Sequence, residues 1–415
     1  MGTGTRVTAT ARARRPGAWL EQIDLPLTLV VATLLVFGLV MVYSASWDFS
    51  LQIYGSPTRI FRRQVMWLGL GLTAALVAFR MDYHWWKRLS ILAMGGTVIA
   101  LLLVLVRGEL RLGATRNLLG GSVQPSELAK LVIILYLAAW LDTHREHIND
   151  WNFGLVPLGA ILGLVGGLIF LQPDLSAATT ILMLGGLLYF LAGGDWRRIL
   201  ALLSGAALVG ALLVALSPTG RLRVQTYVEG LRDPLTSSYH VQRSLEAFAN
   251  GGLFGVGIGE SSTKLTGLPV PPTDSIFAVI GEETGLLGAA LVVALYVLLV
   301  WRSLVIARKA PDMLGQVLAA SLGGWIGMEA MINMAVMVGL MPFAGNALPF
   351  ISAGGSNLVI SLVSVGILGS VARQTALSRQ EKERQLHAVV DLRRRHRRRR
   401  VSRPGRPARA QKTDA

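Results

Sequence analysis

Residues 239–285 read YHVQRSLEAFANGGLFGVGIGESSTKLTGLPVPPTDSIFAVIGEETG and separate two groups of long apolar runs. The stretch begins as a polar segment, expected to be a loop, that is rich in glycine and basic residues, and it continues through a proline-rich strap. The strap ends at Asp274, where the next apolar run starts. A lone carboxylate at the mouth of a membrane helix is the first candidate for chemistry, because ionisable side chains at membrane depth mark functional sites by default.

The composition around this stretch is that of a polytopic membrane protein. Of the 415 residues, 52% are hydrophobic and 15% are charged, and the mean hydropathy is +0.52. Soluble domains carry about 25% charged residues. Apolar runs of about 18 to 25 residues can cross a hydrocarbon core of about 30 Å as helices, and their weak alternation argues against a β-barrel. The absence of cysteine excludes disulfides and thiolate chemistry.

We therefore predict an all-α membrane protein of about ten spanning helices. The expected spans are residues 26–45, 62–80, 90–106, 125–141, 154–171, 174–192, 197–216, 276–301, 314–341 and 350–372. The first run follows an arginine-rich end and is too long for a signal peptide, so it is expected to be an uncleaved helix.

An even number of spans places both termini on one side of the membrane. The cations of the short loops make that side cytoplasmic by the positive-inside rule. These cations are Lys87, Arg88, Arg197, Arg198, Arg308 and Lys309. The sequence then divides into a basic cytoplasmic segment (residues 1–24), a membrane domain (residues 25–372) with a large outside loop (residues 217–275), and a basic tail (residues 373–415). The tail is expected to begin with a short polar helix at residues 374–387 and to be disordered after it, so it is largely disordered.

The basic charge is concentrated in the tail. Residues 373–415 hold 15 Lys and Arg against 4 Asp and Glu, which is +11 of the net charge of +16. Next to a membrane domain, and without a folded nucleic-acid reader, this charge favours contact with anionic lipid over nucleic acid.

The outside loop also carries cations, on the side where they are usually scarce. They are Arg221, Arg223, Arg232, Arg243 and Lys264. A negatively charged ligand and contacts with lipid headgroups explain them equally well.

Several charged residues are expected inside the bundle. Glu127 and Lys130 share a helix face at i, i+3, and they would form either a structural ion pair or part of a functional cavity. Asp174 follows Pro173 at a helix start, so helix capping is favoured over substrate contact. The remaining two are Glu282 and Glu283, about 12 Å along the helix that follows Asp274, with Lys130 as a candidate partner.

Asp274 itself has a structural alternative, because Thr-Asp-Ser before an apolar run is suitable for helix capping. The glycines between Gly252 and Gly259 do not fit a nucleotide-binding pattern. We interpret them as residues that let the backbone bend back into the membrane surface, with amides facing a diphosphate. The non-helical connection of residues 341–356 is expected to line the same site, because irregular backbone at membrane depth must face protein or water.

These motifs, taken together and in order, resemble the SEDS family, which contains the FtsW and RodA peptidoglycan polymerases. The resemblance covers residues 24–372 and is closer to FtsW. It rests on residues 38–46, 124–130, 172–175, 251–259, 273–274 with 276–277, and 348–352 with 354–356.

The resemblance implies an inverting glycosyltransferase that joins lipid II units into glycan strands at the outer leaflet of the bacterial cytoplasmic membrane. Asp274 matches the essential aspartate of the family and would accept the proton of the attacking sugar hydroxyl. Undecaprenyl diphosphate would leave, and Mg²⁺ or Mn²⁺ is a reasonable cofactor, although no metal ligands are identified. The other expected substrate-binding positions are Arg116, Gln124, Ser126, Arg232, Ser261, Lys264, Thr273, Ser352 and Ser356.

The sequence departs from the family pattern at four positions. Pro272 replaces a histidine, Ser275 an aromatic residue and Ala353 a tyrosine, and Asn117 stands where a tryptophan is expected. These changes affect the expected substrate contacts, whereas Asp274 is retained.

The resemblance also implies partners, namely the nascent glycan strand, a class B penicillin-binding protein and the division or elongation machinery. The alternatives are a RodA-like elongation polymerase, a transporter (flippase) of lipid-linked precursors, and a scaffold that recruits division proteins.

Overall fold

The structure is a computed structural model that describes residues 22–107, 109–111, 114–117, 124–233 and 236–401. A helix forms at each of the ten predicted spans, which confirms the predicted all-α polytopic class. These helices are α1 (Leu25–Tyr54), α2 (Arg59–Arg80), α3 (Tyr83–Arg107), α4 (Pro125–Thr143), α5 (Val156–Phe170), α6 (Leu175–Leu191), α7 (Trp196–Leu216), α10 (Ile276–Lys309), α11 (Met313–Met337) and α12 (Gly355–Val401).

Smaller elements connect these helices. A two-stranded antiparallel hairpin, β1 (Glu109–Arg111) and β2 (Ala114–Asn117), lies between α3 and α4. A 3₁₀ turn (Arg145–His147) and a π-helical turn (Trp151–Leu155) precede α5. The loop after α7 contains α8 (Pro218–Arg232) and α9 (Tyr239–Gly251).

Seven helices among the described residues are long and apolar enough to cross a membrane by length and composition. They are α1, α3, α5 with its π-helical turn, α7, α10, α11 and α12 up to Glu383. The helices α2, α4 and α6 are shorter or carry more charges, but they pack within the same bundle. Along α11 most side chains are buried, whereas the side chains of α7 lie mainly at the periphery, so α11 is central.

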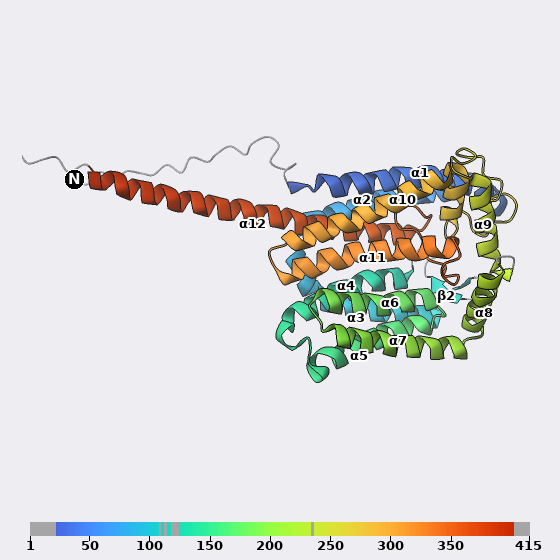
Figure 1. Cartoon of the computed structure of the whole chain (residues 1–415), viewed down its shortest axis with the longest axis horizontal. Helices are drawn as coiled ribbons and strands as arrows, with labels where there is room; N and C mark the ends of the chain where they lie inside the picture. Colours follow the sequence, from blue (N-terminus) through green and yellow to red (C-terminus); the bar gives the residue numbers. More distant parts are fainter. Residues whose placement is uncertain (1–21, 108, 112–113, 118–123, 234–235, 402–415) are drawn as a thin grey trace, which may run out of the picture.

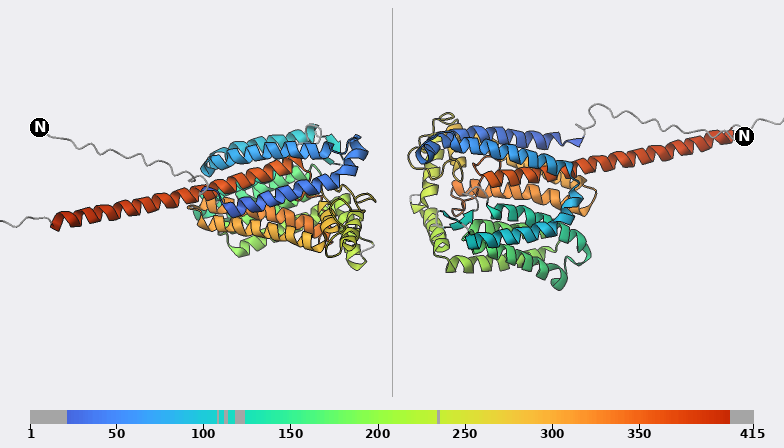
Figure 2. Two further views of the ribbon diagram at one scale, coloured as in Figure 1. Left: turned by 90° about the horizontal axis from the view of Figure 1, so that it is seen from above. Right: turned by 180° about the vertical axis from the view of Figure 1, so that it is seen from behind.

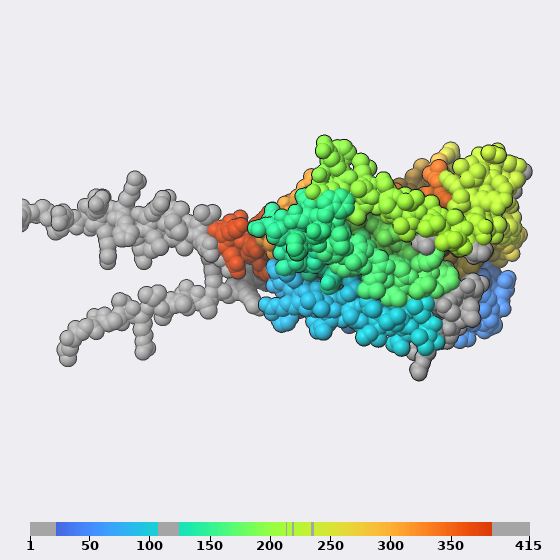
Figure 3. Space-filling view, turned by 90° about the horizontal axis from the view of Figure 1, so that it is seen from below, coloured from blue at the N-terminus to red at the C-terminus, as the bar shows by residue number. Residues whose placement is uncertain are grey.

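The two ends of the bundle differ (Figure 1). Helices α8 and α9 run across one end, and α12 projects from the opposite end (Figures 1 and 2). In the space-filling view the red part of α12 lies at the end opposite the yellow-green segments of α8 and α9 (Figure 3). The prediction of a loop at residues 239–250 is wrong, because this segment forms α9. Its buried residues Val241, Ser244, Ala247 and Gly251 recur every three or four positions, which places them on one helix face.

The helix predicted at residues 374–387 is confirmed, because it continues α12, whereas the disorder predicted for the tail differs from the structure over residues 388–401. Helix α12 continues without interruption to Val401. Its sequence after Gly369 is rich in Arg, Leu, Gln, Glu and Ala, which are good helix formers, and the first proline comes at residue 404. The expectations for residues 1–21 and 402–415 lie outside the described residues.

Helix α10 is broken near its first third. Gly285 has φ 68° and ψ −171°, a backbone conformation that only glycine adopts readily. A Cβ atom at Gly285 would lie 2.4 Å from the backbone nitrogen of Gly255, so the loop after α9 fills the space at the break. Gly251, Gly255 and Gly285 therefore allow backbone to pack closely against backbone.

Candidate active site

Asp274 lies at the end of the strap (residues 259–274), two residues before the start of α10. It is half-buried, and α10, which follows it, begins at the end of the bundle that carries α8 and α9 (Figure 1). The N-cap position of α10 is Ser275, whose hydroxyl donates to the carbonyl of Pro269 at 2.8 Å and does not cap the helix. Asp274 therefore does not occupy the cap position that the sequence allowed for it.

The α11–α12 connection (residues 338–354), which was predicted to line the site, also holds the strap in place. The hydroxyl of Ser352 donates to the carbonyl of Thr273 at 2.8 Å, and the amide of Ala353 donates to the carbonyl of Pro272 at 2.8 Å. From α11, the side-chain amide of Asn333 donates to the carbonyl of Asp274 at 3.0 Å. The backbone of the candidate catalytic residue is thus fixed by contacts with two other segments.

The connection also leaves room for the carboxylate. A Cβ atom added at Gly345 would lie 2.9 Å from Oδ2 of Asp274. Only a residue without a side chain fits there without displacing the carboxylate, so the position of Gly345 bears directly on the geometry of Asp274.

A cavity of about 210 Å³ lies beside the strap, between α1 and α2. Thr273, Pro272 and Ala353 line it on one side, and Arg63 and Gln64 of α2 line it on the other. Two of the four departures from the family pattern therefore face the same cavity, and the hydrogen bond between Ala353 and Pro272 joins them. Arg63 was not predicted as a site residue, although three arginines at the start of a predicted span were a signal.

A second cavity, of about 190 Å³, lies between α8, α9 and the α11–α12 connection. Its basic lining residue is Arg223, whereas the predicted Arg232 is exposed at the end of α8. His240 stacks on Phe343 with ring centroids 4.0 Å apart. Burial, together with the nearby positive charge of Arg223, lowers the pKa of His240, so this side chain is neutral at pH 7.

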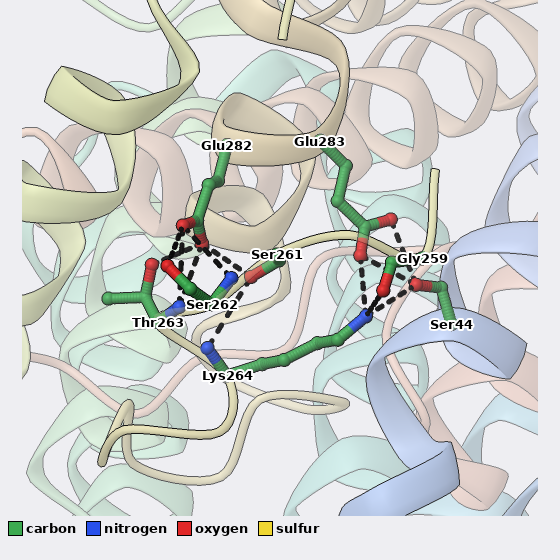
Figure 4. A network of polar contacts seen from close by, with 8 residues as sticks. All are labelled: Ser44, Gly259, Ser261, Ser262, Thr263, Lys264, Glu282 and Glu283. Carbon is green, nitrogen blue, oxygen red and sulfur yellow. Dashed lines mark hydrogen bonds and ion pairs between the residues drawn. The ribbon is translucent and has the colours of Figure 1, made fainter. Parts of the chain in front are cut away.

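The two glutamates of α10 hold the strap against the helix (Figure 4). The ammonium group of Lys264 donates to Glu283 at 2.8 Å and to the carbonyl of Gly259 at 2.7 Å, and the hydroxyl of Ser44 donates to Glu283 at 2.6 Å. Glu282 accepts hydrogen bonds from the hydroxyls of Ser261 and Thr263.

The expectation that Lys130 pairs with one of these glutamates is wrong. Ser261 and Lys264, expected to bind substrate, instead have their polar groups engaged in this internal network. The short sequence distance between the strap and α10 explains the difference, because the strap folds back directly onto the first turns of that helix.

Lys130 instead belongs to a buried cluster of α4, α11 and α12. It donates to Glu127 at 2.9 Å, as predicted, and also to Glu329. Asn357 donates to Glu127 at 2.9 Å. Glu329 was missed, although it is a lone charge within an otherwise apolar run, and it lies one helical turn before Asn333, which contacts Asp274.

Asp174 is a helix cap, as favoured from the sequence. Its carboxylate accepts a hydrogen bond from the amide of Ala177 at 3.2 Å, at the start of α6. Gln124 and Ser126, both expected to bind substrate, donate to the same carboxylate at 3.1 Å and 3.4 Å. These contacts join the first turns of α4 and α6.

The remaining predicted substrate-binding positions lie near Asp274 or have side chains outside the described parts of the structure. Ser356 is half-buried in the first turn of α12. The hydroxyl of Thr273 donates to the carbonyl of Val270 at 3.3 Å, within the strap. Arg116 and Asn117 lie on β2, where side chains are not among the described parts of the structure.

No group of three or more His, Asp or Glu side chains suited to a metal ion occurs among the described residues. Asp274 offers a single carboxylate. A single carboxylate fits Mg²⁺ or Mn²⁺ only in the type of site that is common for phosphate substrates. In such a site one carboxylate, the phosphate oxygens of the substrate and water coordinate the ion.

Comparison with known proteins agrees with the motifs. Residues 25–377 match the profile of the FtsW/RodA/SpoVE family, described as "Cell cycle protein". "Probable peptidoglycan glycosyltransferase FtsW" of Geobacter metallireducens is 36% identical over 357 residues, covering 85% of this chain and 95% of the relative. "Stage V sporulation protein E" of Bacillus subtilis is 36% identical over 356 residues, covering 84% and 97%.

Solved structures share the fold. A chain from a peptidoglycan synthase complex that coordinates polymerization and crosslinking aligns with a TM-score of 0.69 at 28% identity, covering 85% of this chain and 98% of that chain. The rod shape determining protein RodA of Thermus thermophilus aligns with a TM-score of 0.63 at 28% identity, covering 85% and 97%. The chain, as its motifs indicated, therefore belongs to the FtsW/RodA/SpoVE family.

Proposed function

We propose that this chain is a peptidoglycan glycosyltransferase of the FtsW type, which joins lipid II units into glycan strands at the outer face of the cytoplasmic membrane. Its membership of the family and the names of its relatives support this activity. The observation that carries the assignment to a site is the fixed position of Asp274, with its backbone held by Asn333 and its carboxylate against Gly345.

In the proposed reaction, the 4-hydroxyl of the terminal GlcNAc of lipid II attacks the anomeric carbon of the growing strand. A bond forms between that oxygen and the anomeric carbon, and the bond from the carbon to the diphosphate oxygen breaks. Asp274 accepts the hydroxyl proton, and undecaprenyl diphosphate leaves with the bonding electrons. Direct displacement inverts the anomeric centre, from an α-linked diphosphate to a β-glycosidic bond.

A single carboxylate suffices for this chemistry. Glycosidases use a second carboxylic acid to protonate a poor leaving group, whereas a diphosphate leaves without protonation. It does require neutralisation of its charge. Arg63, which lines the cavity next to Thr273, and Arg223, in the second cavity, are candidates to meet an anionic ligand.

A divalent cation remains part of the proposal. When bound, Mg²⁺ or Mn²⁺ would stabilise negative charge on the departing diphosphate. Asp274 is the residue that would hold it, together with phosphate oxygens and water.

The similarity to a chain from a peptidoglycan synthase complex supports a partner that crosslinks the strand, and we propose a class B penicillin-binding protein. The cation distribution supports the proposed orientation, with both termini in the cytoplasm and the tail near anionic lipid.

The test uses purified protein in liposomes containing lipid II, with and without divalent ions and the cognate transpeptidase. We expect Asp274→Asn to lower the polymerisation rate about 10²- to 10⁴-fold, the usual contribution of a general base, while the melting temperature stays unchanged. Glu260→Gln removes an exposed carboxylate from the same strap and should retain activity. Undiminished glycan synthesis by Asp274→Asn would remove Asp274 as the base, and movement of lipid II without polymerisation would favour a transporter.

A further inference from the structure

The loop that fills the break in α10 is apolar and uncharged. Residues 251–259 read GGLFGVGIG, and the next charged residue is Glu260. We call residues 252–258 the apolar loop. Four of its side chains are largely exposed: Leu253 (59%), Phe254 (80%), Val256 (44%) and Ile258 (58%).

Backbone hydrogen bonds fix the apolar loop against α10 on both sides of Gly285. The carbonyl of Gly252 accepts from the amide of Leu286 at 2.9 Å, and the amide of Val256 donates to the carbonyl of Glu282 at 3.0 Å. The amide of Gly257 likewise donates to the carbonyl of Glu283 at 3.0 Å. These amides are therefore not available to a diphosphate, contrary to our interpretation of the glycines.

The same hydrogen bonds fix the depth of the loop, because α10 is a spanning helix. The ion pair between Arg302 and Asp24 marks the end of the bundle at which α1 begins. Leu286 is sixteen residues from Arg302, or about 24 Å along the helix at 1.5 Å per residue. Along α1, Ser44 is twenty residues from Asp24, or about 30 Å, and Ser44 contacts Glu283.

The length along α10 gives the depth of Leu286 directly, and the length along α1 gives the depth of Glu283, three residues before it. Both lengths place Leu286 inside a hydrocarbon core of about 30 Å, close to its edge at the α8/α9 end. Leu286 and Leu287 are themselves 58% and 57% exposed, so they face outward from the bundle where a spanning helix meets lipid. The apolar loop continues this surface, since its backbone bonds to both residues.

We propose that the apolar loop is immersed in the acyl chains of the outer leaflet, near the headgroup boundary, and so anchors the strap that ends at Asp274. Lipid is the occupant that the structure favours, because the surface is continuous with the lipid-facing side of α10 and carries no charge. Irregular backbone is tolerated at this depth because its polar groups bond to the broken helix.

The natural absence of cysteine makes a direct test possible. Single cysteines are introduced by Phe254→Cys in the apolar loop, Leu291→Cys on the exposed side of α10 as the lipid reference, and Glu260→Cys in the strap as the water reference. Each carries a spin label, and the full chain is placed in lipid nanodiscs. Collision of the label is measured with oxygen, which concentrates in hydrocarbon, and with a water-soluble nickel chelate.

We expect the label at Phe254 to favour oxygen over the nickel chelate by several-fold relative to Glu260, approaching the value at Leu291. A ratio equal to that at Glu260 would overturn the proposal, because the loop would then face water. A label shielded from both agents would overturn it too, because the loop would then contact protein, such as a second copy. Unchanged melting temperatures of the labelled variants establish that each variant is folded. We expect this result for Phe254→Cys, because the side chain of Phe254 is exposed.

Discussion

The ion pair between Lys264 and Glu283 gives the sharpest test of how the strap is held. Both side chains are buried, with 5% and 0% of their surface exposed. Replacing Lys264 by methionine keeps the length and apolar part of the side chain but removes the ammonium group. The carboxylate of Glu283 then stays buried, with the hydroxyl of Ser44 as its remaining donor among the described contacts.

The expected cost follows from that burial. Removing one partner of a buried ion pair costs about 3–5 kcal/mol, because the other charge is left uncompensated. With an unfolding entropy of about 2.1 cal/mol/K per residue, a chain of this length loses about 1 °C of melting temperature per kcal/mol. Lys264→Met should therefore lower the melting temperature by about 3–6 °C. The double variant Lys264→Met with Glu283→Gln should recover much of the loss, because no buried charge remains.

The assay is thermal unfolding of the purified protein in one detergent, followed by tryptophan fluorescence. Lys87→Met is the matched control, because Lys87 pairs with Asp142 at 2.5 Å on a surface where the side chains are 38% and 23% exposed. Such pairs contribute about 0.2–1 kcal/mol. If Lys264→Met lowers the melting temperature no more than Lys87→Met does, the reasoning from burial is refuted.

Three further predictions concern glycines and a histidine. Gly345→Ala should lower the polymerisation rate about tenfold without changing the melting temperature, because the added Cβ displaces the Asp274 carboxylate. Gly354→Ala is the control, because an added Cβ at Gly354 has space. Equal activity of the two variants would contradict the prediction. Gly285→Ala should cost more than about 2 kcal/mol, because its positive φ and a backbone contact exclude a side chain, and a melting temperature matching that of the Gly354→Ala control would count against it. Because burial lowers the pKa of His240, only the unfolded chain gains its proton as the pH falls below about 6.5. Stability should therefore decline from pH 7 to pH 5, and His240→Gln should flatten that decline in melting curves; parallel curves would speak against the assignment.

Much of the fold follows from local patterns in the sequence. Apolar runs of membrane length predicted the ten helices, because a chain in lipid must satisfy its backbone polar groups within each helix. Asp174 was correctly interpreted as a cap from its place after Pro173. The i, i+3 spacing predicted the contact between Glu127 and Lys130, since both lie on the same helix.

Partners from separate helices could not be predicted in the same way. Glu329 joins the cluster of Lys130 from a helix about 200 residues further along the chain, and no spacing rule connects the two. The pairing of Glu283 with Lys264, in place of Lys130, depends on how the strap folds back onto α10. The structure of the tail differed from the prediction for another reason. Its charge suggested disorder, whereas its helix-forming residues extend α12.

By itself, the sequence determined the class of the protein, its family and the candidate base Asp274, because membrane spans and short motifs are encoded in neighbouring residues. Only the tertiary structure decided which charges meet, which glycines leave space for backbone or for the Asp274 carboxylate, and which cavities lie beside the strap. These features depend on the distances between helices that are far apart in the chain, and such distances are set by the packing of the whole bundle.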